Sequence, residues 1–247
     1  MAERERADVL LVLRGLVQSR QKAQALIMAG QVFSGERKVD KAGDRLLLDA
    51  PLRVKTPMAY VSRGGLKLEA ALDHFGVDPA GKSCIDVGAS TGGFTDCLLQ
   101  RNAVKVHAID VGYGQLAWKV RNDPRVTVVE RTNFRTVPDD FFDEMFDLAV
   151  VDVSFISLGL ILPSLKRFIR DDAEAVVLVK PQFEAGPEKV GKGGIVREES
   201  VRQEVLARVL KTASEEGFVV LETMECPVPG ADGNIEFFAY LKWKSEH

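Results

Sequence analysis

Cysteine is scarce in this sequence of 247 residues: it has three, an odd number, and no two form a C-x-x-C pair. Neither a disulfide framework nor a zinc site is indicated, and the thiols suit a reducing cytoplasm. Long apolar runs are absent too. The longest weakly polar segment, residues 153–165, is too short to span a membrane. The N-terminal MAERERAD lacks the apolar stretch of a secretory signal. These absences predict a soluble, cytoplasmic protein without a metal.

A strong overall charge is also missing, because 33 lysines and arginines stand against 36 aspartates and glutamates. The charge is unevenly spread, however. Residues 1–55 hold eleven basic and seven acidic side chains, and the rest of the chain is acidic. Such asymmetry is typical of a basic module joined to a different kind of domain. We expect a small domain at 1–54, a linker at 55–60 and a large domain at 61–247.

The small domain reads as two helices followed by a hairpin. The pattern predicts a helix at 7–14 that ends at Gly15, and a second that is capped by Ser19 and ends at Gly30. Residues 31–48 alternate turn residues with short apolar pieces, as a hairpin would. The predicted apolar face shared by the two helices consists of Val9, Leu10, Leu13, Leu16, Ala23, Leu26 and Ile27.

Two basic residues of the second helix lie at positions where a positive charge is unfavourable. Arg20 and Lys22 lie in its first turn, where positive charge opposes the helix dipole. A phosphate bound at this helix N-terminus would explain them, and Arg6, Arg14 and Lys41 would extend the phosphate-binding surface. A solvated basic face with no partner is the alternative that the charges alone leave open.

The segment SRQKAQALIMAGQVFSGERKVDKAG resembles the small RNA-binding domain first described in the fourth protein of the small ribosomal subunit. The resemblance covers about residues 4–50. It implies an RNA partner, bound through the second helix and the adjoining loop. The residues expected to bind RNA, including one from the start of the large domain, are Arg6, Arg14, Ser19, Arg20, Lys22, Lys41 and Arg63.

The large domain alternates apolar strands with helical stretches, which predicts an α/β fold with a seven-stranded, mostly parallel sheet. The expected strands are 83–88, 104–110, 126–130, 147–153, 175–180, 218–226 and 235–243. The expected helices are 64–75, 93–101, 115–121, 157–169 and 197–216. In such folds ligands bind outside the carboxyl ends of the strands, so the residues that end strands are the candidates for function.

The loop after the first of these strands reads IDVGASTGGFTD, residues 85–96. Counting from Gly88, a dinucleotide fingerprint needs glycine where Ser90 stands, and a P-loop needs lysine where Phe94 stands. The loop therefore suits a nucleoside without phosphates. Asp110 ends the next strand about 20 residues later, where an acid accepts hydrogen bonds from ribose hydroxyls. A tight turn whose glycines serve packing alone is the alternative.

S-adenosylmethionine meets these requirements, since it is a nucleoside with an amino-acid tail and no phosphate. The D-x-G-x-x-x-G-G-F pattern resembles the first motif of Rossmann-like S-adenosylmethionine-dependent methyltransferases. The residues expected to bind the cofactor are Asp86, Gly88, Ser90, Thr91, Gly92, Gly93, Phe94, Asp110, Asn133 and Asp152.

Four charged residues stand where the fold does not need them. Asp152 and Lys180 end apolar strands, Lys67 lies near the start of a helix, and Glu236 interrupts an apolar strand. Each alone is more often a satisfied ion pair or a solvated strand end. Four charges that converge on one sheet edge instead suggest an active site.

The order Lys67, Asp152, Lys180, Glu236 matches the Lys-Asp-Lys-Glu tetrad of FtsJ-like ribose 2'-O-methyltransferases. With an RNA-binding module in front, the whole chain resembles the TlyA family, named haemolysins but acting on cytidines of ribosomal RNA. The blocks that carry this resemblance are VSRGGLKLEAAL, DVGASTGGFTD, DVGYGQLAWKVRNDPRV, ERTN, DVSFISL, VKPQFEAG and GNIEFF.

The resemblance implies that these four residues are catalytic and that Lys180 either takes up a proton or orients the hydroxyl. Because the chain ends soon after its last expected strand, the family pattern favours 23S over 16S ribosomal RNA. The glycine-rich segment 184–196, with Lys189 and Lys192, is expected to be either a mobile lid over RNA or a plain connector. A non-catalytic assembly factor and a membrane-active haemolysin are the competing functions, and the oligomeric state is left open.

Overall fold

A computed structural model describes residues 3–55 and 58–244 of the chain. They form two compact units that divide between residues 58 and 59. The expected linker at 55–60 spans this division, and its residues 56 and 57 lie outside the described residues. Each unit is described by itself.

The described residues of the small unit form two helices and five short strands. They are β1 (Arg4–Arg6), α1 (Ala7–Leu13), α2 (Arg20–Met28), β2 (Val32–Ser34), β3 (Arg37–Lys38), β4 (Arg45–Leu47) and β5 (Leu52–Val54). Strand β2 pairs antiparallel with β3 and β5, and β1 pairs with β4. Ser19 Oγ accepts a hydrogen bond from the backbone N–H of Lys22 at 3.2 Å and caps α2. Both predicted helices and the hairpin are confirmed.

The core of the small unit differs from the predicted apolar face. Its buried members include Ala7, Leu11, Ala23 and Ile27, whereas Leu13 and Leu16 are 69% and 41% exposed. Helix α1 has only seven residues and ends before Gly15, whose φ of +68° turns the chain. The prediction was therefore wrong for Leu13 and Leu16, because α1 turns residues 7, 10 and 11 inward instead.

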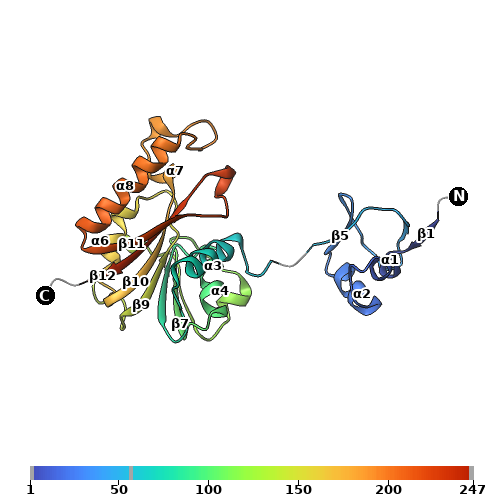
Figure 1. Ribbon diagram of the computed structural model, residues 1–247. Coiled ribbons are helices and arrows are strands. Elements are labelled where there is room, and N and C mark those ends of the chain that lie inside the picture. The colour runs from blue at the N-terminus through green and yellow to red at the C-terminus, as the bar shows by residue number, and fades with distance from the viewer. Residues whose placement is uncertain (1–2, 56–57, 245–247) are drawn as a thin grey trace. The chain divides into compact units, whose positions relative to one another are not determined.

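The large unit is built on one seven-stranded sheet in the order β11-β12-β10-β9-β6-β7-β8 (Figure 1). Its strands are β6 (Ser83–Val87), β7 (Lys105–Ile109), β8 (Val126–Val129), β9 (Phe146–Val151), β10 (Ile169–Val179), β11 (Phe218–Glu225) and β12 (Phe237–Trp243). The neighbours from β10 to β8 are parallel, whereas β12 is antiparallel to both of its neighbours. The predicted mostly parallel α/β sheet is confirmed.

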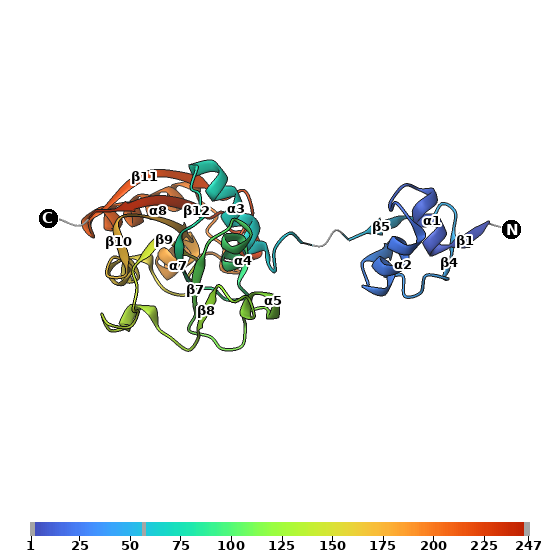
Figure 2. The ribbon, with the colours of Figure 1, turned by 90° about the horizontal axis from the view of Figure 1, so that it is seen from below.

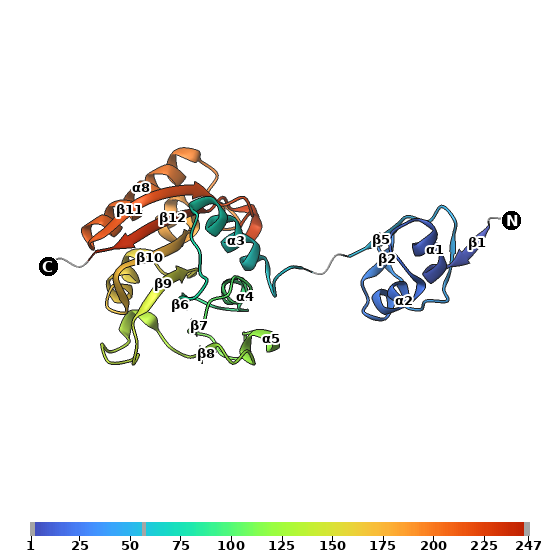
Figure 3. The same cartoon turned by 60° about the horizontal axis from the view of Figure 1, so that its bottom comes forward.

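Helices cover both faces of the sheet (Figures 2 and 3). They are α3 (Arg63–Phe75), α4 (Gly93–Gln100), α5 (Trp118–Arg121), α6 (Leu162–Leu165), α7 (Pro181–Glu184) and α8 (Glu199–Glu215). One apolar cluster packs α3 and α4 against the sheet, and a second packs α6 and α8 against the opposite face. All five residues of β6 are buried, as expected of a central parallel strand.

Several expected elements were wrong in extent, among them the strand expected at 175–180, which begins six residues earlier as β10. The helix at 157–169 is instead a 3₁₀ turn at Leu158–Leu160 followed by α6, and the segment's last residue already belongs to β10. Pro163 lies in the first turn of α6, where it prevents a longer helix from running through it. Helix α5 is shorter than predicted. Glu236 does not interrupt a strand, because β12 begins one residue later.

Candidate functional site

Two cavities open at the carboxyl edge of the sheet. The first, of about 320 Å³, is lined by residues at the ends of β6, β7 and β9 and by the segment after β8. The second, of about 280 Å³, lies between the start of α3, the loop before α4 and the ends of β9 and β10. Gly88, Ser90, Asp152 and Ser154 line both. The cavities therefore adjoin, and two ligands bound in them would meet at these four residues.

The glycines of the 85–96 loop bring backbone segments together. A Cβ at Gly88, which has a φ of +90°, would clash with the backbone of Asp152 at the end of β9. A Cβ at Gly93 would clash with the hydroxyl of Ser62 at the start of α3, and one at Gly92 would press on Leu116. Packing thus accounts for these glycines, and it brings the two strand ends and α3 close enough to form the cavities.

Asp110 is placed to bind a ribose in the first cavity. Its two carboxylate oxygens accept the backbone N–H groups of Ser90 and Gly112, each at 2.7 Å. Each oxygen keeps a second lone pair, which a ligand hydroxyl can use. Among the residues that the structure describes, no lysine or arginine lines this cavity, and Phe134, Ile156 and Ile161 form an apolar wall. The lining fits the nucleoside of S-adenosylmethionine and offers no cation for a phosphate.

The residues expected to bind the cofactor divide into three groups. Gly88, Ser90, Asp110, Asn133 and Asp152 line the first cavity. Thr91, Gly93 and Phe94 line the second cavity only. Asp86 and Gly92 line neither.

Asp86 is fully buried within β6, and Thr95 Oγ1 donates a hydrogen bond to its Oδ2 at 2.6 Å. Burial raises the pKa of this carboxyl to about 7. The structure therefore gives Asp86 a place behind the loop that lines the cavities, where its contact is with α4.

Two ion pairs gather the four predicted charges at this edge. Lys180 Nζ lies 2.5 Å from Asp152 Oδ1, and it donates a hydrogen bond to Ser154 Oγ at 2.9 Å. Lys67 Nζ lies 2.5 Å from Glu236 Oε2. Both lysines and Asp152 line the second cavity, whereas Glu236 is buried behind it at 2% exposure.

The sheet register explains why Glu236, which precedes β12, lies at the same edge as Lys180, which follows β10. Because β12 is antiparallel, its first residue, Phe237, pairs with the last residue of β10, Val179. The residue preceding β12 and the residue following β10 therefore emerge at the same edge. The sequence predicted the convergence of Glu236 and Lys180, but the antiparallel strand that causes it is visible only in the structure.

The single-turn helix α7 connects this site to its surroundings, and its position after Lys180 was the only sign of this role in the sequence. Gln182 Nε2 donates to Glu236 Oε1 at 2.9 Å. Glu184 accepts hydrogen bonds from Ser157 Oγ at 2.8 Å and from the backbone N–H of Leu158 at 2.7 Å. Helix α7 thus holds both the buried acid and the loop that follows β9.

That loop carries an exposed aromatic side chain, which the sequence reasoning also missed. Phe155 is 89% exposed, has a φ of +63° and lines the first cavity. Its ring centroid lies 4.7 Å from that of Phe183 on α7. A bulky residue with positive φ is uncommon and strained. An exposed phenylalanine in such a conformation, at the mouth of a cavity, is suited to stacking against a flat ligand.

In the small unit, two of the predicted RNA-binding arginines have an internal partner. Asp8 is fully buried in α1. Its carboxylate accepts hydrogen bonds from Arg6 at 3.0 Å, and from Arg20 and Gln24 at 2.9 Å each. The Arg6 guanidinium holds the pKa of this carboxyl well below its usual range. The unfavourable position of Arg20 in the first turn of α2 therefore has a structural explanation.

The other predicted RNA-binding residues differ in whether their side chains contact other residues of the protein. Arg14 donates to the backbone carbonyls of Ala50 and Leu48, which fastens the end of α1 to the segment after β4. Lys22 and Lys41 are exposed, and their side chains have no hydrogen-bonding or ionic partner among residues 3–55 and 58–244. Arg63 is exposed and lines the second cavity. Ser19 serves as the α2 cap.

The glycine-rich segment 184–196 is fastened at several points. Lys189 Nζ lies 2.7 Å from Glu204 on α8. The buried amide of Asn234 accepts the N–H of Val196 at 3.1 Å and donates to the carbonyl of Gly194 at 3.0 Å. The expected closure over RNA stays a prediction. Within the described part of the chain, no cluster of three or more acidic, histidine or cysteine side chains could hold a metal ion.

The comparison with known proteins agrees with this geometry. Residues 60–243 match the FtsJ-like methyltransferase family, and residues 5–50 match the S4 domain. TlyA of Mycobacterium tuberculosis, named a 16S/23S rRNA (cytidine-2'-O)-methyltransferase, is 46% identical over all of this chain and 92% of its own length. YqxC of Bacillus subtilis, named provisionally as an rRNA methyltransferase, is 53% identical over 99% of this chain and 88% of its own length.

Solved structures give the same result. A protein of Streptococcus thermophilus named as a hemolysin has a TM-score of 0.75 at 45% identity, over 100% of this chain and 90% of its own. NodS, an N-methyltransferase of Bradyrhizobium japonicum, shares the fold of the large unit at 15% identity and a TM-score of 0.52, over 74% of this chain and 86% of its own. The chain is therefore an FtsJ-like methyltransferase that carries an S4 domain. More narrowly, it belongs to the TlyA family, as the sequence motifs predicted.

Proposed function

We propose that this protein transfers the methyl group of S-adenosylmethionine to the 2'-hydroxyl of a cytidine in ribosomal RNA. The observation that carries the proposal is the junction of the two cavities, where Lys180 contacts Asp152 and Ser154. The name of the M. tuberculosis relative supports the ribosomal cytidine as acceptor. The S4 domain supports an RNA substrate. We further propose that the protein acts in the cytoplasm, where ribosomes are present.

The cofactor supplies an electrophilic methyl group when bound. The chain's own residues hold the cofactor and the acceptor on either side of the junction. Asp110 would bind the ribose of the cofactor, with Asn133 and Phe134 beside its base. Thr91, Gly93 and Phe94 would face the acceptor side. Holding two reactants in line at one point removes much of the entropic part of the barrier.

Lys180 is the group best placed to act on the acceptor hydroxyl. Its Nζ faces the second cavity and can hydrogen-bond to the 2'-oxygen. A proton passed from Nζ to Asp152 Oδ1, 2.5 Å away, would free its lone pair to take up the hydroxyl proton. The Lys67–Glu236 pair holds a second cation at the same cavity, where it can contact the RNA backbone. Phe155 lines the first cavity next to the junction residue Ser154 and would stack on a base bound there.

The test is transfer of tritiated methyl from S-adenosylmethionine to 23S RNA, 16S RNA and intact ribosomal subunits, followed by mapping of ribose methylation. A 2'-O-methylcytidine in one of them is the expected product. The two RNAs are separate arms because the relative's name covers both, and the preference for 23S stays a prediction. Base methylation, or no methylation of any of these RNAs, would overturn the proposal.

The Lys180→Arg variant tests the role of this lysine. Arginine keeps the charge and the donors but does not give up a proton. We expect a loss of methyl transfer of roughly 10² to 10⁴-fold, the usual contribution of general acid–base catalysis. Cofactor binding, measured by calorimetry, should be unchanged. Substantial remaining turnover would leave Lys180 with an orienting role only.

The competing functions make different predictions for the same preparation. A non-catalytic assembly factor would bind the RNA and transfer no methyl group. A membrane-active protein, as hemolysin names suggest for some relatives, would release dye from lipid vesicles. No helix in the described part of the chain is long and apolar enough to cross a membrane. Dye release without methyl transfer would replace our proposal.

A further inference from the structure

Trp118 is the most exposed tryptophan of the chain and has no role in the site described above. It begins α5, is 79% exposed and lines neither cavity. Its indole has no ring or hydrogen-bonding partner among residues 3–55 and 58–244. Tryptophan is enriched where proteins bind partners.

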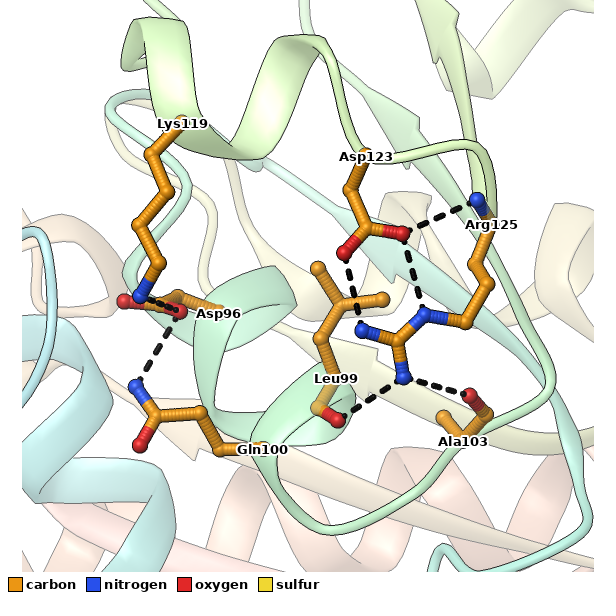
Figure 4. A network of polar contacts seen from close by, with 7 residues as sticks. All are labelled: Asp96, Leu99, Gln100, Ala103, Lys119, Asp123 and Arg125. Atoms are coloured by element: carbon orange, nitrogen blue, oxygen red, sulfur yellow. Dashed lines mark hydrogen bonds and ion pairs between the residues drawn. The ribbon is translucent and has the colours of Figure 1, made fainter.

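The backbone that carries this ring is held firmly, although α5 has only four residues. A helix of one turn is not stable alone. Figure 4 shows how the protein fastens it: Lys119 Nζ lies 3.1 Å from Asp96 Oδ1, and Asp96 is 1% exposed on α4. The other oxygen of Asp96 accepts the backbone N–H of Val61 at 2.9 Å. The residue after Trp118 is thus tied to the buried part of the large unit.

A second set of contacts fixes the segment that follows α5 (Figure 4). Arg125 donates to Asp123 Oδ1 at 3.0 Å and to Oδ2 at 2.8 Å. The same guanidinium donates to the carbonyl of Leu99, at 3.0 Å, near the end of α4. Both ends of the α5 turn are therefore anchored to α4. A rigid, exposed ring of this kind loses little conformational entropy when a ligand stacks on it.

The position of Trp118 links it to the acceptor cavity. The backbone N–H of Ala117 donates to the carbonyl of Thr91 at 3.1 Å, and Thr91 lines the second cavity. Trp118 is therefore one residue from the rim of that cavity. Its neighbours on the surface, Lys119 and Asn122, are exposed and polar. A single ring among polar groups is not an apolar patch of the kind that proteins bury against each other.

A flat ring with a cation beside it fits an unpaired nucleotide, whose base stacks while its phosphate meets the charge. Lys119 is the cation beside the ring: it is paired with Asp96, and its side chain stays 67% exposed. We propose that Trp118 is a stacking platform for an unpaired base of the RNA substrate that flanks the methylated nucleotide. The inference rests on the proposed function for the identity of the substrate.

Intrinsic fluorescence tests the stacking directly. The chain has two tryptophans. The second, Trp243, is partly buried and packs on Phe218 at 5.2 Å between ring centroids. In the Trp243→Phe protein all tryptophan emission comes from Trp118, and we expect saturable quenching when protein-free 23S or 16S ribosomal RNA is added. The Trp118→Phe protein, which keeps Trp243, should show no saturable change. Quenching by ribosomal subunits but not by either RNA would overturn the proposal in favour of a protein partner.

Binding measurements test how much the ring contributes. We expect Trp118→Ala to weaken RNA binding about 5- to 100-fold, the usual effect of removing one base–aromatic stack. Trp118→Phe should recover most of the affinity. Val104→Ala is the matched control, because Val104 is an exposed apolar residue just before β7, at the opposite edge of the sheet. Equal affinities of wild type and Trp118→Ala would overturn the platform.

These readouts separate the platform from the proposed function. Quenching and RNA affinity are measured without methyl transfer, and binding of S-adenosylmethionine should be the same in wild type and Trp118→Ala. Failure of wild-type protein to methylate any ribosomal RNA would count against the proposed function alone. Normal methylation by Trp118→Ala at subsaturating RNA would count against the platform alone.

Discussion

The small unit and the large unit both carry cations at helix starts and strand ends, but their partners differ. In the small unit, Arg20 donates a hydrogen bond to the buried carboxylate of Asp8, so a contact within the fold explains the position of this cation. In the large unit, Lys180 pairs with Asp152 at the wall of two cavities, where no packing requirement accounts for the charges. A cation that a sequence pattern leaves unexplained thus indicates function only when it lines a cavity, as Lys180 and Lys67 do and Arg20 does not.

The largest effect should come from separating the buried pair of the large unit. Glu236→Ala leaves Lys67 buried and unpaired, which should lower the free energy of unfolding by about 3–5 kcal/mol and abolish methyl transfer. Urea unfolding and the tritium assay measure the two effects. The exposed pair Lys211–Glu215 is the control, and Glu215→Ala should change stability by less than about 0.5 kcal/mol.

A double variant shows whether the Lys67–Glu236 pair is needed for stability alone or also for methyl transfer. Lys67→Met with Glu236→Leu replaces both charges by apolar side chains of similar length, and should restore most of the stability. It should not restore methyl transfer, because the cation at the second cavity is gone. Recovery of activity together with stability would show that the pair serves the fold, as Asp8 and its partners do in the small unit.

The next effect concerns pH and the buried carboxyl of Asp86. Its pKa is raised to about 7 by burial, whereas an unfolded chain would give about 4. The folded state therefore holds a proton that the unfolded state releases. The resulting stabilisation is complete below about pH 4 and is lost as pH rises to about 7, with an upper limit of roughly 4 kcal/mol. Unfolding free energies across this window should fall for wild type.

Asp86→Asn tests this assignment, since an amide is neutral at every pH and its oxygen can still accept the Thr95 hydrogen bond. The fall between pH 4 and 7 should become much shallower. Asp8→Asn is the opposing case, because the pKa of Asp8 is lowered, and its stabilisation is lost only as pH falls through the acid range. An unchanged pH profile in Asp86→Asn would contradict the raised pKa.

The sequence predicted that Asp152 and Lys180 would meet, because the carboxyl ends of parallel strands lie at one edge. Lys67 and Glu236 were completed by the family resemblance, since neither follows a parallel strand. The sequence could not predict Ser154, Gln182 or Glu184, whose partners lie on other elements and depend on how loops turn after the strands. It could not predict the internal partner of Arg20 for the same reason. The cation in the first turn of α2 was visible, but its partner is twelve residues away on α1, and only the packing of the two helices brings them together.

A smaller effect is expected from Glu184, which positions the loop that carries Phe155. Glu184→Ala removes the acceptor for Ser157 and Leu158 and lets that loop shift. A misplacement of this kind should lower kcat about 10- to 100-fold. It should also raise the KM for S-adenosylmethionine, because Phe155 and Ile156 of the same loop line the first cavity. Glu184→Gln keeps one acceptor oxygen and should retain more activity. Glu188→Ala, at an exposed acid of the same segment, is the control. Equal kcat values in Glu184→Ala and Glu188→Ala would contradict the positioning role.

The smallest effect concerns two kinds of cation in the small unit. One kind has no partner among the described residues, and the other is paired with a buried carboxylate. Lys22 has no partner among the described residues, so Lys22→Ala should leave thermal stability unchanged. It should weaken RNA binding a few-fold and reduce the slope of log affinity against log salt by about 0.7 to 1, as expected for one lost phosphate contact. Arg20→Ala should instead lower the melting temperature, because Asp8 loses a donor. Affinities at several salt concentrations and melting curves measure both. A full change in salt slope for Arg20→Ala without a change in melting temperature would show that Arg20 serves RNA rather than the fold, and the contrast between the two units would then disappear.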